Sequence, residues 1–280
     1  KKMIVGIDLG TTNSLVGVYQ DGQVKLIPNA FGEYLTPSVV ALDDNDEIIV
    51  GKIAKERLVT HPDRTLSQFK RFMGTKHELV LGNRTYKAEE LSSFVIRKLV
   101  DDAESFLGEK VEEVIVSVPA YFNDAQRYAT KLAGQFAGVK IERIINEPSA
   151  AALAKKSMSN QEDQSFVVAD FGGGTLDISV VELFDNVVEI VSIAGDNRLG
   201  GEDFTAAIAE EFLTSNHLSR KSISREFYSK ILVQAEKAKL NLNINEEVQM
   251  LVMDQEKEYS LDLTYQRFYE LCQPLLARLK

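Results

Sequence analysis

One unit occurs twice in this chain, 162 residues apart, and it constrains the fold more than any other feature. In the first copy an apolar run leads into Asp8-Leu9-Gly10-Thr11 and another leads out; in the second, Asp170-Phe171-Gly172-Gly173-Gly174-Thr175 lies between two apolar runs. Each copy then reaches a two-residue hairpin signal, Asp21-Gly22 or Asp185-Asn186, and a third apolar run. A repeat of this spacing indicates two related domains rather than a short-period solenoid.

The glycine turn of the second copy is suited to holding a phosphate. Consecutive glycines permit backbone conformations closed to other residues, and the N–H groups of such a turn can converge on an anion. If the two copies face each other, their turns hold phosphate oxygens, while Asp8 and Asp170 hold a hydrated Mg²⁺, which prefers few protein ligands. Thr11 and Thr175 offer hydroxyls at matching places, and Asp177 could orient a water. The alternative is a plain hairpin whose strand-end aspartates pair with turn N–H groups.

The remaining segments predict a mixed α/β fold. A long amphipathic helix is expected over residues 88–107, and Asn123 with Gln126 forms a capping-box pattern that opens another helix. The further expected elements are strands at 37–41, 47–50, 111–118 and 139–145, short helices at 52–59 and 66–72, a hairpin at 79–86, helices at 202–215, 226–242 and 264–280, and a hairpin at 247–261.

We divide the chain into two lobes near the polar residues 157–164. The first lobe spans 1–160, with a core of 1–38 and 88–160 and an inserted subdomain at 39–87. The second lobe spans 161–280, with a core of 161–199 and an inserted subdomain at 200–275. Because the first lobe closes with strand, helix, strand, helix over 111–156 and the second does not, we expect the second core to continue beyond residue 280.

Composition limits the classes of partner and the cellular compartment that we expect for this chain. The net charge of the 280 residues is −10 without a dense basic block, which argues against nucleic acid or an anionic membrane as the main partner. The single cysteine, Cys272, excludes an internal disulfide and is expected to be a buried residue on a helix. No apolar run approaches the roughly 20 residues of a membrane span, and no signal peptide follows Lys1-Lys2-Met3. We therefore expect a cytoplasmic protein.

Several other kinds of site are excluded by context. The chain has no Walker A motif, and Gly172-Gly173-Gly174 runs into a strand rather than a helix, which excludes a dinucleotide fingerprint. The three histidines are scattered without metal-ligand spacing, and no nucleophilic triad is apparent. From composition alone, Lys70 is an ordinary solvated lysine and Glu147 an ordinary acid at a helix N-terminus.

Five motifs together resemble the ATPase domain of DnaK-type heat-shock chaperones. They are Ile7-Asp8-Leu9-Gly10-Thr11-Thr12-Asn13-Ser14, Val118-Pro119-Ala120-Tyr121-Phe122-Asn123-Asp124, Ile145-Asn146-Glu147-Pro148-Ser149-Ala150-Ala151-Ala152, Asp170-Phe171-Gly172-Gly173-Gly174-Thr175 and Leu199-Gly200-Gly201-Glu202-Asp203-Phe204. The segments at 32–38 and 88–93 look closest to the HscC-like branch of that family. The resemblance implies an actin-like ATPase fold: two lobes, each with an RNase H-like core and an inserted subdomain, flanking an ATP cleft.

The resemblance also implies roles for individual residues. Asp8 and Asp170 match the Mg²⁺-side aspartates, Lys70 matches the lysine near the attacking water, and Glu147 and Asp177 match the acids that complete the metal and water shell. The positions implied at the nucleotide are Gly10, Thr11, Thr12, Asn13, Gly172, Gly173, Gly174, Thr175, Gly200, Gly201, Glu202, Glu236, Lys239, Leu240 and Asn243.

Some implied positions concern communication, and two depart from the family pattern. Pro119 and Arg127 match the pair that relays the nucleotide state, and Arg143 and Asn146 match positions where J-domain co-chaperones dock. Leu240 stands where the family has an arginine that stacks on adenine, and Asn243 where it has a serine. A leucine packs on a base but supplies no cation–π attraction.

Three functions remain open from the sequence. The first is the ATP-binding and ATP-hydrolysing module of a chaperone, whose nucleotide state controls peptide binding by a domain outside this chain. J-domain co-chaperones, a nucleotide exchange factor and unfolded peptides would be its partners, and this chain alone is expected to hydrolyse ATP weakly or not at all. The others are a small-molecule kinase and an actin-like filament ATPase on the same fold.

Overall fold

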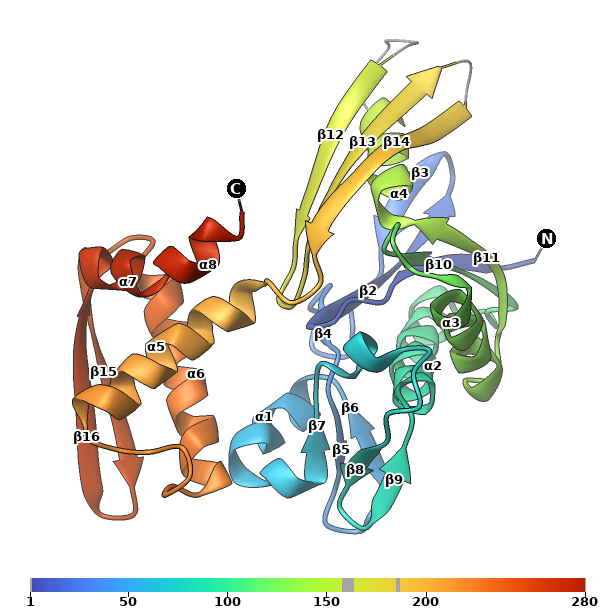
Figure 1. Ribbon diagram of the computed structural model, residues 1–280. Helices are drawn as coiled ribbons and strands as arrows, with labels where there is room; N and C mark the ends of the chain where they lie inside the picture. The colour runs from blue at the N-terminus through green and yellow to red at the C-terminus, as the bar shows by residue number, and fades with distance from the viewer. Residues whose placement is uncertain (1, 158–163, 185–186, 280) are drawn as a thin grey trace.

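The computed structural model describes residues 2–157, 164–184 and 187–279, and its first sheet has the strand order β11-β10-β1-β2-β3 (Figure 1). These strands are β1 (Ile4–Asp8), β2 (Asn13–Gln20), β3 (Gln23–Leu26), β10 (Glu113–Val118) and β11 (Lys140–Asn146), and the short β4 (Thr36–Pro37) pairs with β2. The β1–β10 and β10–β11 pairs are parallel, and the β1–β2–β3 meander is antiparallel. Buried side chains of β1, β2 and β10 pack against α2 (Ala88–Leu107) and α3 (Asp124–Phe136), forming the largest core.

The second sheet repeats the meander, as the sequence predicts. It consists of β12 (Gln164–Phe171), β13 (Leu176–Phe184) and β14 (Val187–Asp196). Asp8 lies opposite Leu15 in the first hairpin, and Asp170 lies opposite Asp177 in the second. The offset of 162 residues maps every β1–β2 pair onto a β12–β13 pair, so the two units share one register. Helix α4 (Glu147–Ser157) packs on one face of this second sheet.

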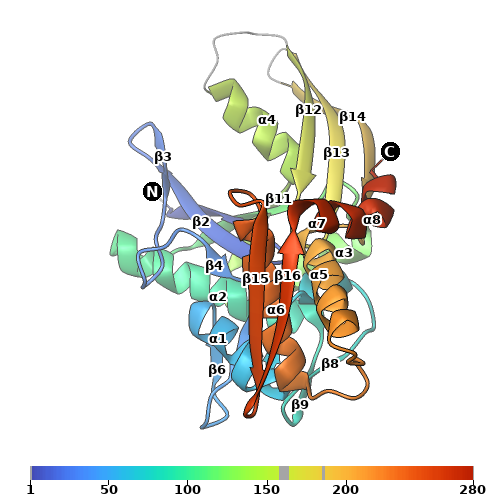
Figure 2. The same ribbon diagram turned by 90° about the vertical axis from the view of Figure 1, so that its left-hand side faces the viewer.

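Two further groups of elements branch from the sheets, one at the bottom and one at the left of Figure 1. The first holds β5 (Val40–Leu42), β6 (Ile48–Val50), α1 (Lys52–Thr60), the 3₁₀ turn η1 (Pro62–Arg64), β7 (Thr65–Leu66), the 3₁₀ turn η2 (Phe69–Phe72), β8 (Leu79–Leu81) and β9 (Arg84–Tyr86). The second holds α5 (Gly201–Ser215), α6 (Arg225–Asn241), β15 (Glu247–Asp254), β16 (Lys257–Thr264), α7 (Tyr265–Leu271) and α8 (Gln273–Ala277). Figure 2 shows the β15–β16 hairpin lying along α6. Apolar side chains of the hairpin, α5 and α6 form a core that is separate from the largest one.

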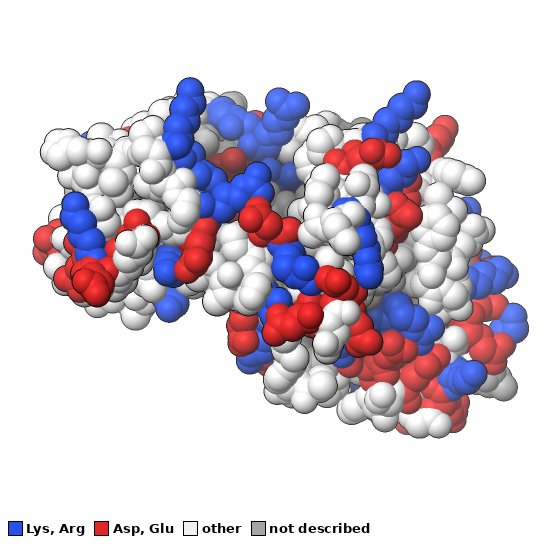
Figure 3. Space-filling model, turned by 90° about the horizontal axis from the view of Figure 1, so that it is seen from below, with Lys and Arg blue, Asp and Glu red and all other residues white. Residues whose placement is uncertain are grey.

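The two branches meet between α1 and α6. Arg225 donates from Nη1 to Oδ1 of Asp63 across this contact, at 2.5 Å. Seen from below, acidic and basic side chains are intermingled over the surface (Figure 3). None of the helices that the structure describes is both long enough and apolar enough to cross a membrane.

Most expected elements are present, and three expectations were wrong. Of the helix expected at 66–72, only Phe69–Phe72 is helical, as the short 3₁₀ helix η2, because Gln68 takes a left-handed conformation (φ 59°) between β7 and η2. The strand expected at 37–41 is divided between β4 and β5. The helix expected over 264–280 is interrupted at Cys272, because Pro274 has no N–H with which to continue the hydrogen-bond ladder. The predicted lobe boundary and the hairpin signal at 185–186 fall largely outside the described residues.

The buried cysteine yields a first prediction. Cys272 is 2% exposed between α7 and α8, and burial raises its thiol pKa to about 11, with Lys239 opposing the rise. Only the thiolate attacks disulfide reagents, and each pKa unit changes its fraction about tenfold. We expect the folded protein to react with the aromatic disulfide DTNB at pH 8 at least about 100-fold more slowly than the same chain in guanidinium chloride. Equal rates in the two conditions would contradict the buried position.

Candidate nucleotide site

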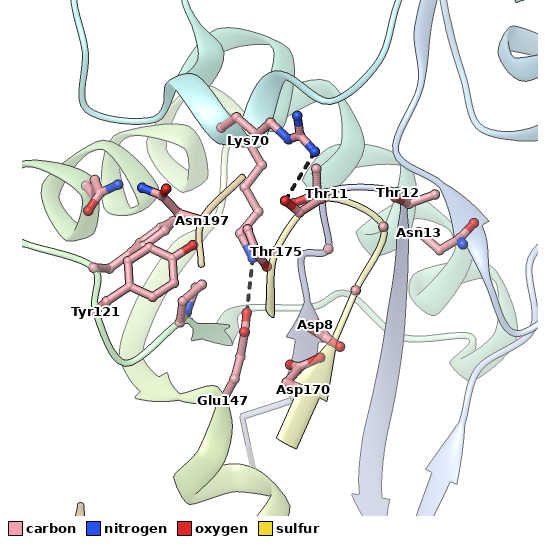
Figure 4. A pocket seen from close by; sticks show the side chains of 18 of the residues that line it. Asp8, Thr11, Thr12, Asn13, Lys70, Tyr121, Glu147, Asp170, Thr175 and Asn197 are labelled. Atoms are coloured by element: carbon pink, nitrogen blue, oxygen red, sulfur yellow. Dashed lines mark hydrogen bonds and ion pairs between the residues drawn. The ribbon is translucent and has the colours of Figure 1, made fainter. Parts of the chain in front are cut away.

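A cavity of about 310 Å³ lies between the two duplicated turns (Figure 4). Its walls come from the ends of β1 and β12, from the turns that follow these strands, from η2 and from the start of α4. The predicted residues that line it are Asp8, Gly10, Thr11, Thr12, Asn13, Lys70, Pro119, Glu147, Asp170, Gly172, Gly173, Gly174 and Thr175. The tertiary structure therefore gathers one compact set from five separate parts of the chain: residues 8–13, 70, 119, 147 and 170–175.

Two aspartates stand side by side at the floor of this cavity (Figure 4). Asp8 ends β1 and accepts a hydrogen bond from the Ser117 hydroxyl at 2.9 Å. Burial, and then the charge of Asp8, raise the pKa of Asp170. Two carboxylates close together disfavour the charged form of the group, and a cation placed between them favours it.

Lys70 and Glu147 form an ion pair on the opposite wall. The Lys70 ammonium donates to Oε1 of Glu147 at 3.0 Å and lies 5.6 Å from the centre of the Phe122 ring. Burial raises the pKa of Glu147, while Lys70 opposes that rise. Lys70 is only 9% exposed, so its composition-based interpretation as a solvated lysine was wrong. Glu147 does begin a helix, α4, but it also faces the cavity.

The two turns present unused backbone donors. In the part of the chain that the structure describes, the N–H groups of Thr11, Thr12, Gly173 and Gly174 make no hydrogen bond. Backbone N–H groups that point into a cavity without partners form a site for an anion. These free donors are compatible with the phosphate clamp, which stays a prediction.

Asp177 lies beside the cavity rather than in it. It lines a neighbouring hollow of about 430 Å³ together with Tyr121, Gly195 and Asn197. Burial raises the pKa of Asp177 to about 6, and a hydrogen bond with the Thr175 side chain opposes the rise. Thr175 therefore links the main cavity to a carboxyl group that can exchange a proton near neutral pH.

The predicted residues of the second insertion do not line the cavity. Lys239 donates to the carbonyl of Gly201 at 2.8 Å and to the Thr205 hydroxyl at 2.9 Å, and it pairs with Glu236 at 2.7 Å. The two residues that depart from the family pattern are also outside it: Leu240 is 55% exposed, and Asn243 lines a separate surface hollow beside Tyr265.

Gly200 and Gly201, at the start of α5, pack instead against the glycine turn at 172–174. Gly201 N–H donates to the Gly172 carbonyl at 3.0 Å. A Cβ on Gly200 would lie 2.3 Å from the backbone of Gly173 and Gly174, so only glycine fits there.

The predicted communication residues separate into two places. Pro119 lines the cavity, whereas Arg127 on α3 donates to the Phe122 carbonyl at 2.9 Å and to Oδ1 of Asn146 at 2.7 Å. Arg127 and Asn146, which were assigned to different roles, are thus in direct contact. Arg143 lies on β11, an edge strand of the first sheet, and is exposed.

Six cavity residues were missed as site candidates: Leu35, Arg71, Tyr121, Phe122, Gln126 and Asn197. Arg71 follows Lys70 directly, and Tyr121 lies within a motif that carries the family resemblance, so both had a signal in the sequence. Leu35 lies in the segment 32–38 that resembles the HscC-like branch, whereas Asn197 had no signal and reaches the cavity only through the folding of a distant loop.

These features define the class of protein. A duplicated strand–turn–strand unit, with an aspartate at each strand end and a cavity between the turns, is the arrangement of the actin-like ATPase fold, as expected from the sequence. The chain matches the family model described as "Hsp70 protein" over residues 4–83 and 77–280. It is 44% identical over 248 residues to the "Chaperone protein DnaK" of Thermotoga neapolitana, a match that covers 87% of this chain and 41% of that protein.

The chain belongs to the Hsp70 family. The family resemblance and the actin-like fold inferred from the motifs are confirmed by these matches, and the kinase and filament alternatives are not favoured. The chain spans about two-fifths of the length of the curated relative, which is 41% covered. The resemblance to the HscC-like branch stays a prediction.

Proposed function

We propose that this chain binds ATP with Mg²⁺ and acts as the ATP-hydrolysing module of an Hsp70-type chaperone. The observation that carries the proposal is the convergence of Asp8, Asp170, Lys70 and Glu147 on one cavity lined by two glycine-containing turns. The carboxylates suit a metal, the turns suit phosphates and the lysine suits a developing negative charge.

The charges of the cavity support a requirement for a divalent cation. Its lining carries three carboxylates, Asp8, Glu147 and Asp170, against two cations, Lys70 and Arg71. A polyphosphate would therefore enter a site that is already acidic, which is unfavourable without added positive charge. No cluster of three or more acidic, histidine or cysteine residues that could hold a metal occurs among the described residues. The donor set fits an ion held through water by Asp8 and Asp170.

The mechanism follows from positioning and charge. When bound, Mg²⁺ would neutralise phosphate oxygens and orient the triphosphate. The unused N–H groups of the two turns bind phosphate oxygens, and Lys70, fixed by Glu147, orients the attacking water and stabilises the charge that develops on the transferred group. Asp177, linked through Thr175, accepts a proton at the end of the reaction.

The remaining roles are proposed by extension from the family. We propose that the two lobes divide near residue 160. We also propose that the nucleotide state is transmitted from Pro119, which lines the cavity, to the contact between Arg127 and Asn146. J-domain co-chaperones would dock near Arg143 and Asn146, and a nucleotide exchange factor and unfolded peptides would be further partners of the whole protein. The single cysteine suits a reducing, cytoplasmic location.

The metal assignment is tested by neutral variants of the two aspartates. We expect Asp8→Asn and Asp170→Asn each to weaken Mg²⁺-dependent ADP binding about 10- to 100-fold, the usual cost of losing a group that orients a metal's ligands. Titration calorimetry with and without EDTA measures this effect.

Asp21→Asn supplies the control for charge. Asp21 belongs to the same meander, but its side chain is 80% exposed and pairs only with Lys25 in the described structure. This variant should bind Mg·ADP as the wild type does. If EDTA weakened ADP binding to Asp8→Asn and to Asp170→Asn as much as it weakened binding to the wild type, the metal role of the two aspartates would be wrong.

A further inference from the structure

Glu202 reaches from the second lobe to two donors of the first. It is the second residue of α5, and its backbone N–H donates to the Gly173 carbonyl at 2.8 Å, which fixes the helix start on the phosphate turn. Its Oε1 accepts a hydrogen bond from the Thr12 hydroxyl at 3.2 Å. Its Oε2 lies 3.9 Å from the Arg71 guanidinium. One carboxylate thus holds a hydroxyl and a cation that come from separate parts of the chain.

Both of these donors lie against the glycine turn at 172–174. A Cβ on Gly173 would be 2.0 Å from the Thr12 hydroxyl, and one on Gly174 would be 2.5 Å from Arg71 Nη2. Arg71 also donates to the Gly174 carbonyl at 3.2 Å. Thr12 and Arg71 line the cavity, whereas Glu202 lies behind them. The Glu202 carboxylate therefore interacts with both donors where they lie against the glycine turn.

The contacts of Glu202 are incomplete. Its Oε2 and the Nε of Arg71 are inaccessible to solvent and have no hydrogen-bond partner within the described structure. Burial raises the pKa of Glu202, and Arg71 opposes the rise. A buried polar atom without a partner costs free energy, so Arg71 gains if a further acceptor reaches its unpartnered Nε. A phosphate oxygen is such an acceptor, because guanidinium and hydroxyl groups bind it strongly.

We propose that Glu202 is an internal competitor for the nucleotide phosphates. Its carboxylate interacts with the Thr12 hydroxyl and the Arg71 guanidinium when no phosphate is bound. When phosphate oxygens enter the cavity, the two donors bind them instead. This inference rests on the proposed function. The simpler role of an acid at a helix N-terminus would stabilise α5 without affecting phosphate affinity.

The test compares Glu202→Gln with the wild type. Glutamine keeps the shape and one acceptor oxygen but removes the charge that holds Arg71. We expect Mg·ADP and Mg·ATP to bind about three- to tenfold more tightly to this variant in titration calorimetry, while adenosine binding is unchanged. Glu210→Gln, an exposed position on the same helix, makes the same charge change away from the cavity and should match the wild type.

The outcomes separate the two proposals. If the wild type binds Mg·ADP and Glu202→Gln binds it equally or more weakly, the competitor role is overturned and the proposed function stands. An equal gain for adenosine, or for Glu210→Gln, would also overturn it, because the effect would not concern the phosphate contacts. If none of the variants binds either nucleotide, the proposed function fails and this inference fails with it. Thermal unfolding of each variant confirms that the protein tested is folded.

Discussion

Replacing Lys70 by methionine should lower the rate of ATP hydrolysis at least about 100-fold, the loss typical when one preorganised donor at a transition state is removed. Lys70 is held by Glu147 at 3.0 Å inside the cavity, so its charge is available where the transferred phosphoryl group would sit. Because ADP lacks that group, Mg·ADP affinity should change less than about threefold. Single-turnover hydrolysis in the full-length polypeptide, together with calorimetry, measures the two quantities separately.

Lys52 provides a matched control, because it has the same two kinds of contact on the surface. It pairs with Glu33 at 2.6 Å and lies 5.2 Å from the centre of the Phe31 ring, but it does not line the cavity. Lys52→Met should therefore leave hydrolysis within about twofold of the wild type. Equal losses in the Lys70 and Lys52 variants, or a Lys70→Met loss that appears entirely in nucleotide affinity, would contradict the catalytic role.

Gly200→Ala, which adds one carbon, should lower the free energy of unfolding by about 2–3 kcal/mol, near the upper end of the costs usual for overpacked sites. The new Cβ would lie 2.3 Å from the carbonyl carbon and oxygen of Gly173 and from the nitrogen of Gly174. Backbone atoms cannot rotate away as a side chain can, so the phosphate turn and the start of α5 must separate. Chemical denaturation of Gly200→Ala measures the change in the free energy of unfolding.

The control lies in the same turn. A Cβ on Gly172 would have only the Thr175 carbonyl oxygen near it, at 3.8 Å, and Gly172 does not take a left-handed conformation. Gly172→Ala should change the free energy of unfolding by less than about 1 kcal/mol. Similar stability of the two variants would mean that the contact between the turn and α5 is not maintained in solution.

Local signals predicted the separate elements well. Helix α2 has the bounds expected from its apolar periodicity, and Asn123 and Gln126 form the reciprocal hydrogen bonds of a capping box, at 2.9 and 3.0 Å. These features depend on residues within one or two turns of each other, so the sequence contains all the information they need. The expectation for 66–72 failed because Gln68 adopts a conformation that no local signal indicated.

The duplicated unit and the family motifs together identified most of the cavity lining, but they could not place the residues of the second insertion. Glu236 and Lys239 bond to each other and to the start of α5 instead of lining the cavity, and Leu240 is largely exposed. Motif matching assigns a position along the chain. Whether a side chain faces the site depends on how the helix packs.

The sequence alone determined the two strand–turn–strand units, the aspartate at the end of each leading strand and the family to which the chain belongs. The tertiary structure decided which side chains meet. Lys70 and Glu147 are 77 residues apart, and Thr12 and Glu202 are 190 apart, yet each pair is in contact. Turn and helix preferences act over a few residues, whereas these contacts exist only because apolar burial brings the sheets and insertions together around one cavity.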